Sequence, residues 1–177
     1  MRLRSMRSTG FAPLIGDDAR VLILGSLPGK RSLREQQYYA HPQNSFWRLM
    51  AQLVQIDPAK SYAERCKALK ENRIALWDVL ASAHRAGSLD SAIEVAGARK
   101  NDFAGLLNEN HGIRLICFNG RKSRELFDRL VVEDLPLAEN FQLVNLPSSS
   151  PAHAAMKFDV KLKHWSVVGR FLVEAKF

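Results

Sequence analysis

The sequence is short of the residues that would indicate a metal-centred, exported or membrane-embedded protein. Among its 177 residues are only two cysteines, Cys66 and Cys117, which are too few for an iron–sulfur cluster and are not spaced as a zinc knuckle. No uninterrupted apolar run approaches the roughly 20 residues of a membrane span. The basic N-terminus is followed by no apolar stretch, which speaks against a secretory signal. We therefore expect a cytoplasmic protein.

Positive charge, by contrast, is abundant. The chain has 26 lysines and arginines against 18 aspartates and glutamates, a net charge of +8. Such a balance favours a polyanionic partner such as nucleic acid. At this length, 46% hydrophobic residues predict one domain with a substantial core. We expect residues 1–18 to form a flexible basic tail and residues 19–177 to form the single domain.

Short apolar runs alternate with amphipathic helical patterns along the chain. The runs are continuously apolar, as in strands that are covered on both faces. They predict strands at Val21–Leu24, Ile74–Val79, Arg114–Phe118 and Phe141–Leu146. Helices are expected over Ser45–Val54, Tyr62–Glu71 and Arg121–Leu130 and from a cap at Asn101 to Asn108. A final helix is expected after a cap at Asp159, with Trp165, Val168 and Leu172 along one face. The alternation predicts an α/β fold, a three-layer α/β/α sandwich with a central, mostly parallel four-stranded sheet.

In such a sheet, ligands bind beyond the carboxyl ends of the strands. The segments that follow the four predicted strands are all rich in turn-forming or polar residues. They are Gly25–Asn44, Asp78–Ser88, Asn119–Ser123 and Asn145–His153. We expect the binding site where these four loops meet.

The first loop carries the most varied chemistry. Gly25 allows backbone to approach a ligand closely, and the neighbouring Lys30 and Arg31 are suited to phosphate contacts. Tyr39 is suited either to stacking on a base or to packing under the loop. Asn44 can cap the following helix or hold a water molecule, and the sequence leaves both roles open. The GxxxxGK[ST] spacing of a phosphate-binding loop is absent.

The other loops offer anion contacts and one carboxylate. Ser148, Ser149 and Ser150 stand between two prolines and present hydroxyl and N–H groups, although a polar surface turn has the same composition. His153 is a candidate phosphate or base contact. Asp78 is the acid nearest to a strand end, and it is either a general base or a cap or salt-bridge partner.

Several of these motifs together resemble the uracil-DNA glycosylase superfamily. They are GSLPG, YYAHPQNSFW, CFNGRK and LPSSSPAHA. GSLPG matches the first active-site motif of the superfamily, whose third residue is a catalytic Asp or Asn in the uracil enzymes; here it is Leu27. The combination looks like the hypoxanthine-DNA glycosylase family, in which an Asn of the extended first motif is catalytic, and Asn44 matches that position.

The resemblance implies a monofunctional enzyme that flips a deaminated base out of double-stranded DNA and hydrolyses its N-glycosidic bond. The catalytic residue would be Asn44, and Tyr39 would stack on the base. Gly25, Ser26, Leu27 and Asn119 would complete the base pocket, while Lys30, Arg31, the serines Ser148–Ser150 and His153 would contact DNA. The residue that fills the gap in the duplex stays open. The resemblance implies neither a metal nor a cofactor, and we expect a monomer.

Three alternatives remain at this stage. A mismatch-specific uracil/thymine glycosylase shares the Pro-Ser loop, but Leu27 argues against it. A DNA lesion-binding module would keep the charge and the pocket without releasing a base. A nucleotide- or sugar-phosphate-binding α/β enzyme would use GSLPG for phosphate, and free nucleotides rather than DNA would stabilise it.

Overall fold

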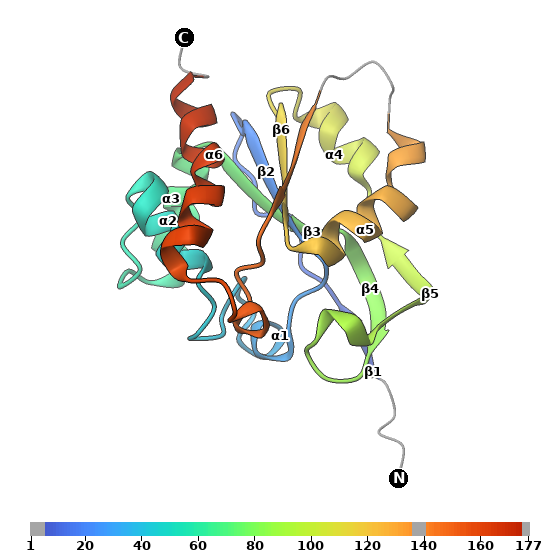
Figure 1. The fold of residues 1–177 in the computed structure, drawn as a ribbon. Coiled ribbons are helices and arrows are strands. Elements are labelled where there is room, and N and C mark those ends of the chain that lie inside the picture. The colour runs from blue at the N-terminus through green and yellow to red at the C-terminus, as the bar shows by residue number, and fades with distance from the viewer. Residues whose placement is uncertain (1–5, 136–140, 175–177) are drawn as a thin grey trace.

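The structure, a computed structural model, describes residues 6–135 and 141–174. Its centre is a parallel sheet with the strand order β3–β2–β6–β7 (Figure 1). The strands are β2 (Val21–Gly25), β3 (Ile74–Asp78), β6 (Leu115–Asn119) and β7 (Gln142–Leu146). Helices α2 (Phe46–Val54), α3 (Tyr62–Glu71) and α6 (Phe158–Glu174) cover one face, and α4 (Phe103–Glu109) and α5 (Arg121–Leu130) cover the other. The predicted α/β/α sandwich is confirmed.

Strands β2, β3 and β6 are buried along their whole length because helices pack on both faces of the sheet. Along β2, Val21 and Ile23 point into the core shared with α2, α3 and α6, whereas Leu22 and Leu24 point into the core shared with α4 and α5. This two-sided burial explains why the strands appear in the sequence as continuous apolar runs. Each predicted strand lies within one residue of its observed bounds.

The predicted helices are present, with two corrections at their N-termini. Asn101 does not cap α4, because Asp102 takes that position and accepts the N–H of Gly105 at 2.9 Å. Asn101 instead donates its side-chain amide to the backbone carbonyl of Asp78 at 2.8 Å. Asp159 lies inside the first turn of α6 rather than at its cap. There its charge still opposes the positive end of the helix dipole.

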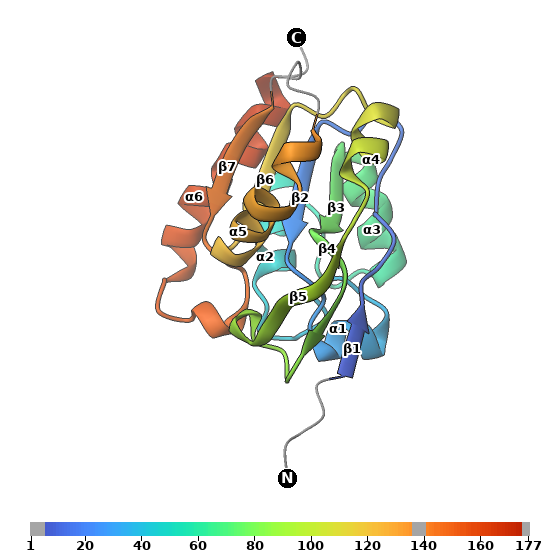
Figure 2. The ribbon, with the colours of Figure 1, turned by 90° about the vertical axis from the view of Figure 1, so that its right-hand side faces the viewer.

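A second, antiparallel sheet was not predicted from the sequence. It contains β1 (Met6–Thr9), β4 (Leu80–Arg85) and β5 (Ile93–Lys100) in the order β1–β4–β5, and it lies beside the carboxyl end of β3 (Figure 2). Only Val79 separates β3 from β4, so the chain passes directly from one sheet to the other. No turn residue marks this passage, which is why the sequence showed a single strand.

The expectation of a flexible tail over residues 1–18 is wrong for residues 6–18. Strand β1 pairs with β4 from Met6↔Arg85 to Thr9↔Ser82. Leu14 exchanges two backbone hydrogen bonds with Leu76, at 2.9 and 2.8 Å. Residues 1–5 lie outside the described residues. The segment before β2 therefore contributes to the fold.

The remaining elements are short. They are α1 (Lys30–Glu35) and the 3₁₀ turns η1 (Asp90–Ala92), η2 (Val132–Asp134) and η3 (Pro151–His153). Helix α1 falls inside the segment that was expected to be a loop. Within residues 6–135 and 141–174, no helix is long and apolar enough to cross a membrane.

Candidate active site

The loops that follow the four parallel strands enclose a cavity of about 610 Å³. Its floor is formed at the carboxyl ends of β2, β3 and β6 by Gly25, Asp78 and Asn119. Its walls come from the segment between β2 and α2, from the β4–β5 connection and from the loop after β7. This position is the one at which open α/β sheets bind ligands. The volume lies within the roughly 300–1,000 Å³ that is usual for small-molecule sites.

Only a glycine fits at position 25 on the floor of the cavity. The parallel register of β2 and β3 places it opposite Asp78. A Cβ atom at Gly25 would stand 2.4 Å from Oδ1 of Asp78 and 3.5 Å from the hydroxyl of Tyr39. The missing side chain therefore makes room for one carboxyl and one phenol at the floor.

The residues after Gly25 are held by side chains from the β4–β5 region. Ser26 donates its hydroxyl to Oδ1 of Asp90 at 2.6 Å. Arg85, only 3% exposed, donates to the carbonyls of Leu27 (3.2 Å) and Pro28. Leu27 itself packs in the core against the α4–α5 side. Its apolar side chain thus supplies part of the wall and no polar group.

The two adjacent tyrosines have different roles in the structure. Tyr38 is 4% exposed, packs edge-on against Phe11 and donates its hydroxyl to the carbonyl of Ala12. Tyr39 lines the cavity and stacks one face on Phe46, with ring centroids 4.1 Å apart and planes 24° apart. Tyr39 also has φ +56°, an uncommon conformation for a bulky residue that often marks a functional position. The structure is consistent with stacking by Tyr39, whereas Tyr38 packs under the loop.

Asn44 lies on the cavity wall just before α2. Its side-chain carbonyl accepts the N–H of Phe46 at 3.0 Å, and its backbone N–H donates to the carbonyl of His41 at 2.8 Å. The capping bond left open by the sequence is therefore present, although the cap position itself is occupied by Ser45. The bond orients the Asn44 amide and leaves it among the residues that line the cavity.

Asn119 and Ser149 lock the Ser-rich loop to the end of β6. Asn119 donates its amide to Oγ of Ser149, and the N–H of Ser149 donates to Oδ1 of Asn119, both at 2.8 Å. The carbonyl of Ser149 accepts the N–H and the hydroxyl of Ser45 at 2.9 and 3.1 Å. Trp165 of α6 donates to the carbonyl of Pro147 at 2.9 Å. Ser149 is 1% exposed, so the structure makes it an internal anchor rather than the DNA contact expected from the sequence.

The other members of the Ser-rich loop remain at the cavity wall. The hydroxyl of Ser148 accepts the N–H of Ser150, and the hydroxyl of Ser150 accepts the N–H of Ala152 at the start of η3, both at 3.2 Å. His153 follows in η3 and is exposed. These bonds shape a turn that keeps polar groups at the mouth of the cavity.

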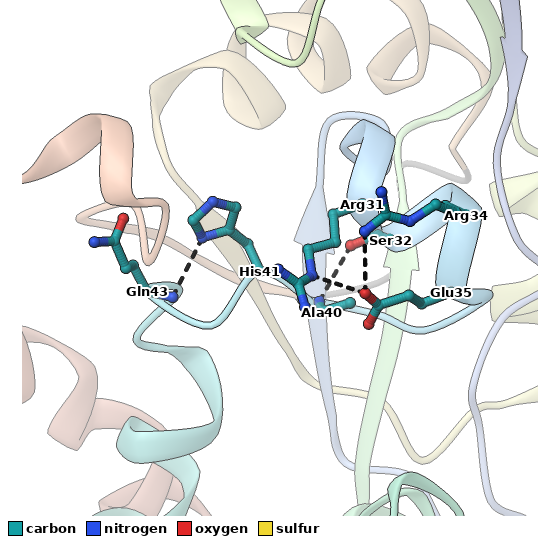
Figure 3. A network of polar contacts seen from close by, with 7 residues as sticks. All are labelled: Arg31, Ser32, Arg34, Glu35, Ala40, His41 and Gln43. Atoms are coloured by element: carbon teal, nitrogen blue, oxygen red, sulfur yellow. Dashed lines mark hydrogen bonds and ion pairs between the residues drawn. The ribbon is translucent and has the colours of Figure 1, made fainter.

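Helix α1 contributes Lys30, Arg31 and Ser32 to the opposite wall of the cavity. The hydroxyl of Ser32 accepts the N–H of Ala40 at 3.2 Å, which holds the residue directly after Tyr39 (Figure 3). Arg31 pairs with Glu35 at 2.7 Å across one helical turn. This exposed pair neutralises part of the positive charge that the sequence offered for phosphate.

Positive charge nevertheless gathers at the mouth of the cavity. Lys30 and Arg31 come from α1 and Lys122 comes from α5, while the imidazoles of His41 and His153 add hydrogen-bonding groups from neighbouring loops. Lys30 is exposed, and its backbone N–H donates to the hydroxyl of Ser88 at 3.2 Å, which ties α1 to the β4–β5 connection. The rim therefore suits an anionic backbone, with the less charged cavity beneath it.

Asp78 is the acidic group on the floor. It is 4% exposed, and its Oδ2 has no hydrogen-bond partner among the described residues. Burial, assisted by the negative charge of Asp90, raises its pKa to about 7, although Arg85 acts in the opposite direction. The carboxyl is thus partly protonated near neutral pH. The sequence had left it as a general base or as a cap or salt-bridge partner.

Within residues 6–135 and 141–174, no three His, Cys, Asp or Glu side chains lie together in a group that could hold a metal ion. The cavity is lined by amide and hydroxyl groups, by the carboxyls of Asp78 and Asp90, and by basic side chains.

Comparison with known proteins identifies the family. The model of the uracil DNA glycosylase superfamily matches residues 12–168. The chain belongs to this superfamily. The superfamily resemblance seen in the motifs is confirmed, and membership implies that the protein acts on DNA. The matched range also includes part of the segment that was expected to be a tail.

Two curated relatives and one solved structure are similar to this chain over most of its length. A Methanosarcina acetivorans protein named hypoxanthine DNA glycosylase is 41% identical over 149 residues, which cover 84% of this chain and 89% of the relative. A Methanosarcina barkeri protein of the same name is 42% identical over 121 residues, covering 68% and 75%. The solution NMR structure of a candidate uracil DNA glycosylase from Methanosarcina acetivorans has a TM-score of 0.78 and 38% identity, covering 95% of this chain and 99% of the other.

Several residues of the site were assigned no role from the sequence. Arg85, which holds the carbonyls of Leu27 and Pro28, fell inside the second predicted loop, Asp78–Ser88, and nothing local shows that a charged residue there is buried. His41, Lys122, Leu89 and Asp90 line the cavity. The His-Pro corner and the Arg-Lys pair beside Asn119 were visible signals for the first two. Leu89 gave no signal beyond being apolar within a polar loop.

Proposed function

We propose that this superfamily member is a hypoxanthine DNA glycosylase that releases hypoxanthine from deoxyinosine in DNA and leaves an abasic site. The observation that carries the proposal is the composition of one cavity. Leu27 occupies the position of the usual catalytic acid or amide, while Asn44 and Tyr39 line the same space. The two relatives named hypoxanthine DNA glycosylase support the choice of base.

The proposed reaction begins when the nucleotide leaves the DNA stack. Extrusion costs a few kcal/mol, and less for a weakened pair, which favours deaminated bases. The base then lies against Tyr39 on the ring face opposite to the one that stacks on Phe46. Backbone N–H groups of the Gly25–Leu27 segment approach its edge.

Asn44 positions the attacking water. Its amide is oriented by the bond to the N–H of Phe46, so little reorganisation is needed when the sugar develops positive charge. An amide is not a base at neutral pH, which fits an oxocarbenium-like transition state that needs placement of water more than deprotonation. The lysines among the cavity residues are Lys30 and Lys122, both on the mouth side, and we assign them to phosphate rather than to a covalent step.

The residues around the mouth of the cavity bind the DNA backbone. Lys30, Arg31 and His153 face the duplex from two sides, with Ser148 and Ser150 supplying hydrogen bonds to phosphate. Ser149 contributes by holding this loop. The η3 turn lacks a large apolar side chain for the gap left by the flipped base, whereas Leu89 on the facing rim is 58% exposed. We therefore assign the wedge to Leu89.

The test is single-turnover excision from labelled duplexes that differ in one base: hypoxanthine, uracil, xanthine or thymine. Release of hypoxanthine without strand cleavage is expected. Asn44→Ala should slow it by about 10²-fold or more, since positioning of the water is lost. Robust release of uracil with none of hypoxanthine would instead assign the protein to the uracil/thymine branch. Tight binding of the duplex without release of any base would indicate a lesion-binding module.

A further inference from the structure

One buried polar atom on the cavity floor, Oδ2 of Asp78, has no hydrogen-bond partner among the described residues. The buried hydroxyl of Tyr39 interacts with the Asn119 side chain but makes no hydrogen bond of good geometry within the described part of the chain. Both side chains line the cavity. A buried polar atom without a partner is costly unless a bound molecule supplies the missing bond. The two groups therefore indicate where polar atoms of the bound base lie.

The backbone of β2 and β3 sets the position of the carboxyl. Asp78 is the last residue of β3, and its carboxyl occupies the space that a side chain at Gly25 would fill. The ring of Tyr39 stands beside it and offers a face to the base, with its hydroxyl close to the same point. A base stacked on that ring meets the floor with its edge. Asp78 is thus placed to contact an edge atom of the base, not its face.

Four titratable side chains from three parts of the chain surround Asp78, and two of them change its protonation. Tyr38 and Tyr39 face it from the segment after α1, Arg85 from β4, and Asp90 from η1. Burial and Asp90 raise the pKa of the carboxyl, and Arg85 lowers it in part. Burial also raises the pKa of both tyrosines, so they stay neutral and add no charge. The carboxyl therefore carries its proton in a substantial fraction of molecules near neutral pH, and a protonated carboxyl donates a hydrogen bond.

We propose that Asp78 is the general acid that protonates N7 of the departing purine. The inference rests on the proposed hypoxanthine activity. A purine with a 6-oxo group presents two acceptors, N7 and O6, on one edge. An ionised carboxylate would repel both, whereas the protonated form donates to one of them. N7 is the choice because it belongs to the imidazole ring, which takes up the electrons of the breaking bond.

The step balances in protons and electrons. The C1′–N9 bond breaks and its electron pair stays on the base, while the proton of Oδ2 moves to N7. Hypoxanthine leaves as a neutral molecule, and Asp78 becomes a carboxylate. The water held by Asn44 bonds to C1′, and its proton passes through solvent to Asp78, which restores the acid. The general acid thus avoids the anionic leaving group that Leu27 cannot stabilise.

The experiment measures single-turnover excision of deoxyinosine by the wild-type protein and by Asp78→Asn between about pH 5.5 and pH 9. Asparagine keeps the shape and a donor but has no proton to transfer. The wild-type rate should be constant at low pH and fall about tenfold per pH unit above about pH 7, while the variant is slower by about 10²-fold at pH 6 and independent of pH. A merely structural role would lower the rate without removing its pH dependence.

A modified substrate provides the second readout. In 7-deaza-2′-deoxyinosine a C–H replaces N7, so the proposed acceptor is absent while O6 remains. On this substrate the wild type and Asp78→Asn should react at equal rates at about pH 6, where the wild-type carboxyl is mostly protonated and neither protein can transfer a proton to position 7. Equal rates and profiles of the two proteins on ordinary deoxyinosine would overturn the inference alone, as would a Asp78→Asn defect that persists on the 7-deaza substrate. Absence of hypoxanthine release by the wild type would overturn the proposed function and this inference together.

Discussion

Burial of Asp78 makes a quantitative prediction about stability that is independent of catalysis. The carboxyl has a pKa of about 7 in the folded protein and 3.8 as its ordinary value, so the folded state binds the proton more tightly than the unfolded chain. Stability contributed by the protonated form is therefore complete below about pH 4 and is lost as pH rises toward 7. One pH unit corresponds to about 1.4 kcal/mol, so ionising the buried carboxyl destabilises the fold by roughly 4 kcal/mol in full.

Asp78→Asn removes this titrating group, so the variant should not lose stability at high pH through ionisation of a buried carboxyl. The free energy of unfolding of the variant, minus that of the wild type, should rise by about 3 kcal/mol between pH 5 and pH 8. Urea denaturation followed by tryptophan fluorescence at several pH values measures this difference, in which other titrating groups cancel. Asp17→Asn, an exposed position, is the matched control and should parallel the wild type. A difference that stays constant over this range, or that falls as pH rises, would refute the assignment of a raised pKa.

Three further substitutions test the parts of the site. Gly25→Ala places a Cβ atom 2.4 Å from Oδ1 of Asp78, so we expect a destabilisation of about 1–3 kcal/mol in urea denaturation and loss of excision. Unchanged stability and activity would contradict the close packing of the cavity floor. Arg85→Met leaves the carbonyls of Leu27 and Pro28 without their buried donor, which should lower the free energy of unfolding by about 2–4 kcal/mol. The variant should also keep its full excision rate to a higher pH, because the positive charge that lowers the Asp78 pKa is gone. Leu89→Ala should change stability by less than about 0.5 kcal/mol, since the side chain is exposed, yet slow excision from duplex and not from single-stranded deoxyinosine; equal slowing on both would remove Leu89 as the wedge.

The central sheet was predictable because its strands carry their own signal. The four parallel strands follow short apolar runs. For β2, β3 and β6, burial by helices on both faces of the sheet produces this pattern, whereas β7 is an edge strand and is largely exposed. The antiparallel sheet was missed for the opposite reason. Leu80–Arg85 follows β3 after a single residue, and its pairing with β1 joins residues about 75 positions apart, which no local pattern records.

The candidate site was likewise predictable from the sequence only in part. The motifs after the strand ends resemble those of the superfamily, and this resemblance led to Asn44, Tyr39 and Asn119, all of which line one cavity. The burial and the hydrogen-bond partners of the site residues could not be predicted from the sequence. The sequence offered Ser148, Ser149 and Ser150 as equals, and only the fold shows that Ser149 is bonded on all sides and buried.

Residue types and their order along the chain thus determined which groups arrive at the carboxyl edge of the sheet, because strand direction and loop position follow from local patterns. Tertiary packing alone decided what those groups do there. It separated the stacking Tyr39 from the packed Tyr38, and it brought Arg85 to the carbonyls of the first motif. It also placed Asp78 out of water beside Asp90, which sets the proton on that carboxyl. Desolvation and charge proximity belong to the environment of a group, and distant parts of the chain supply that environment.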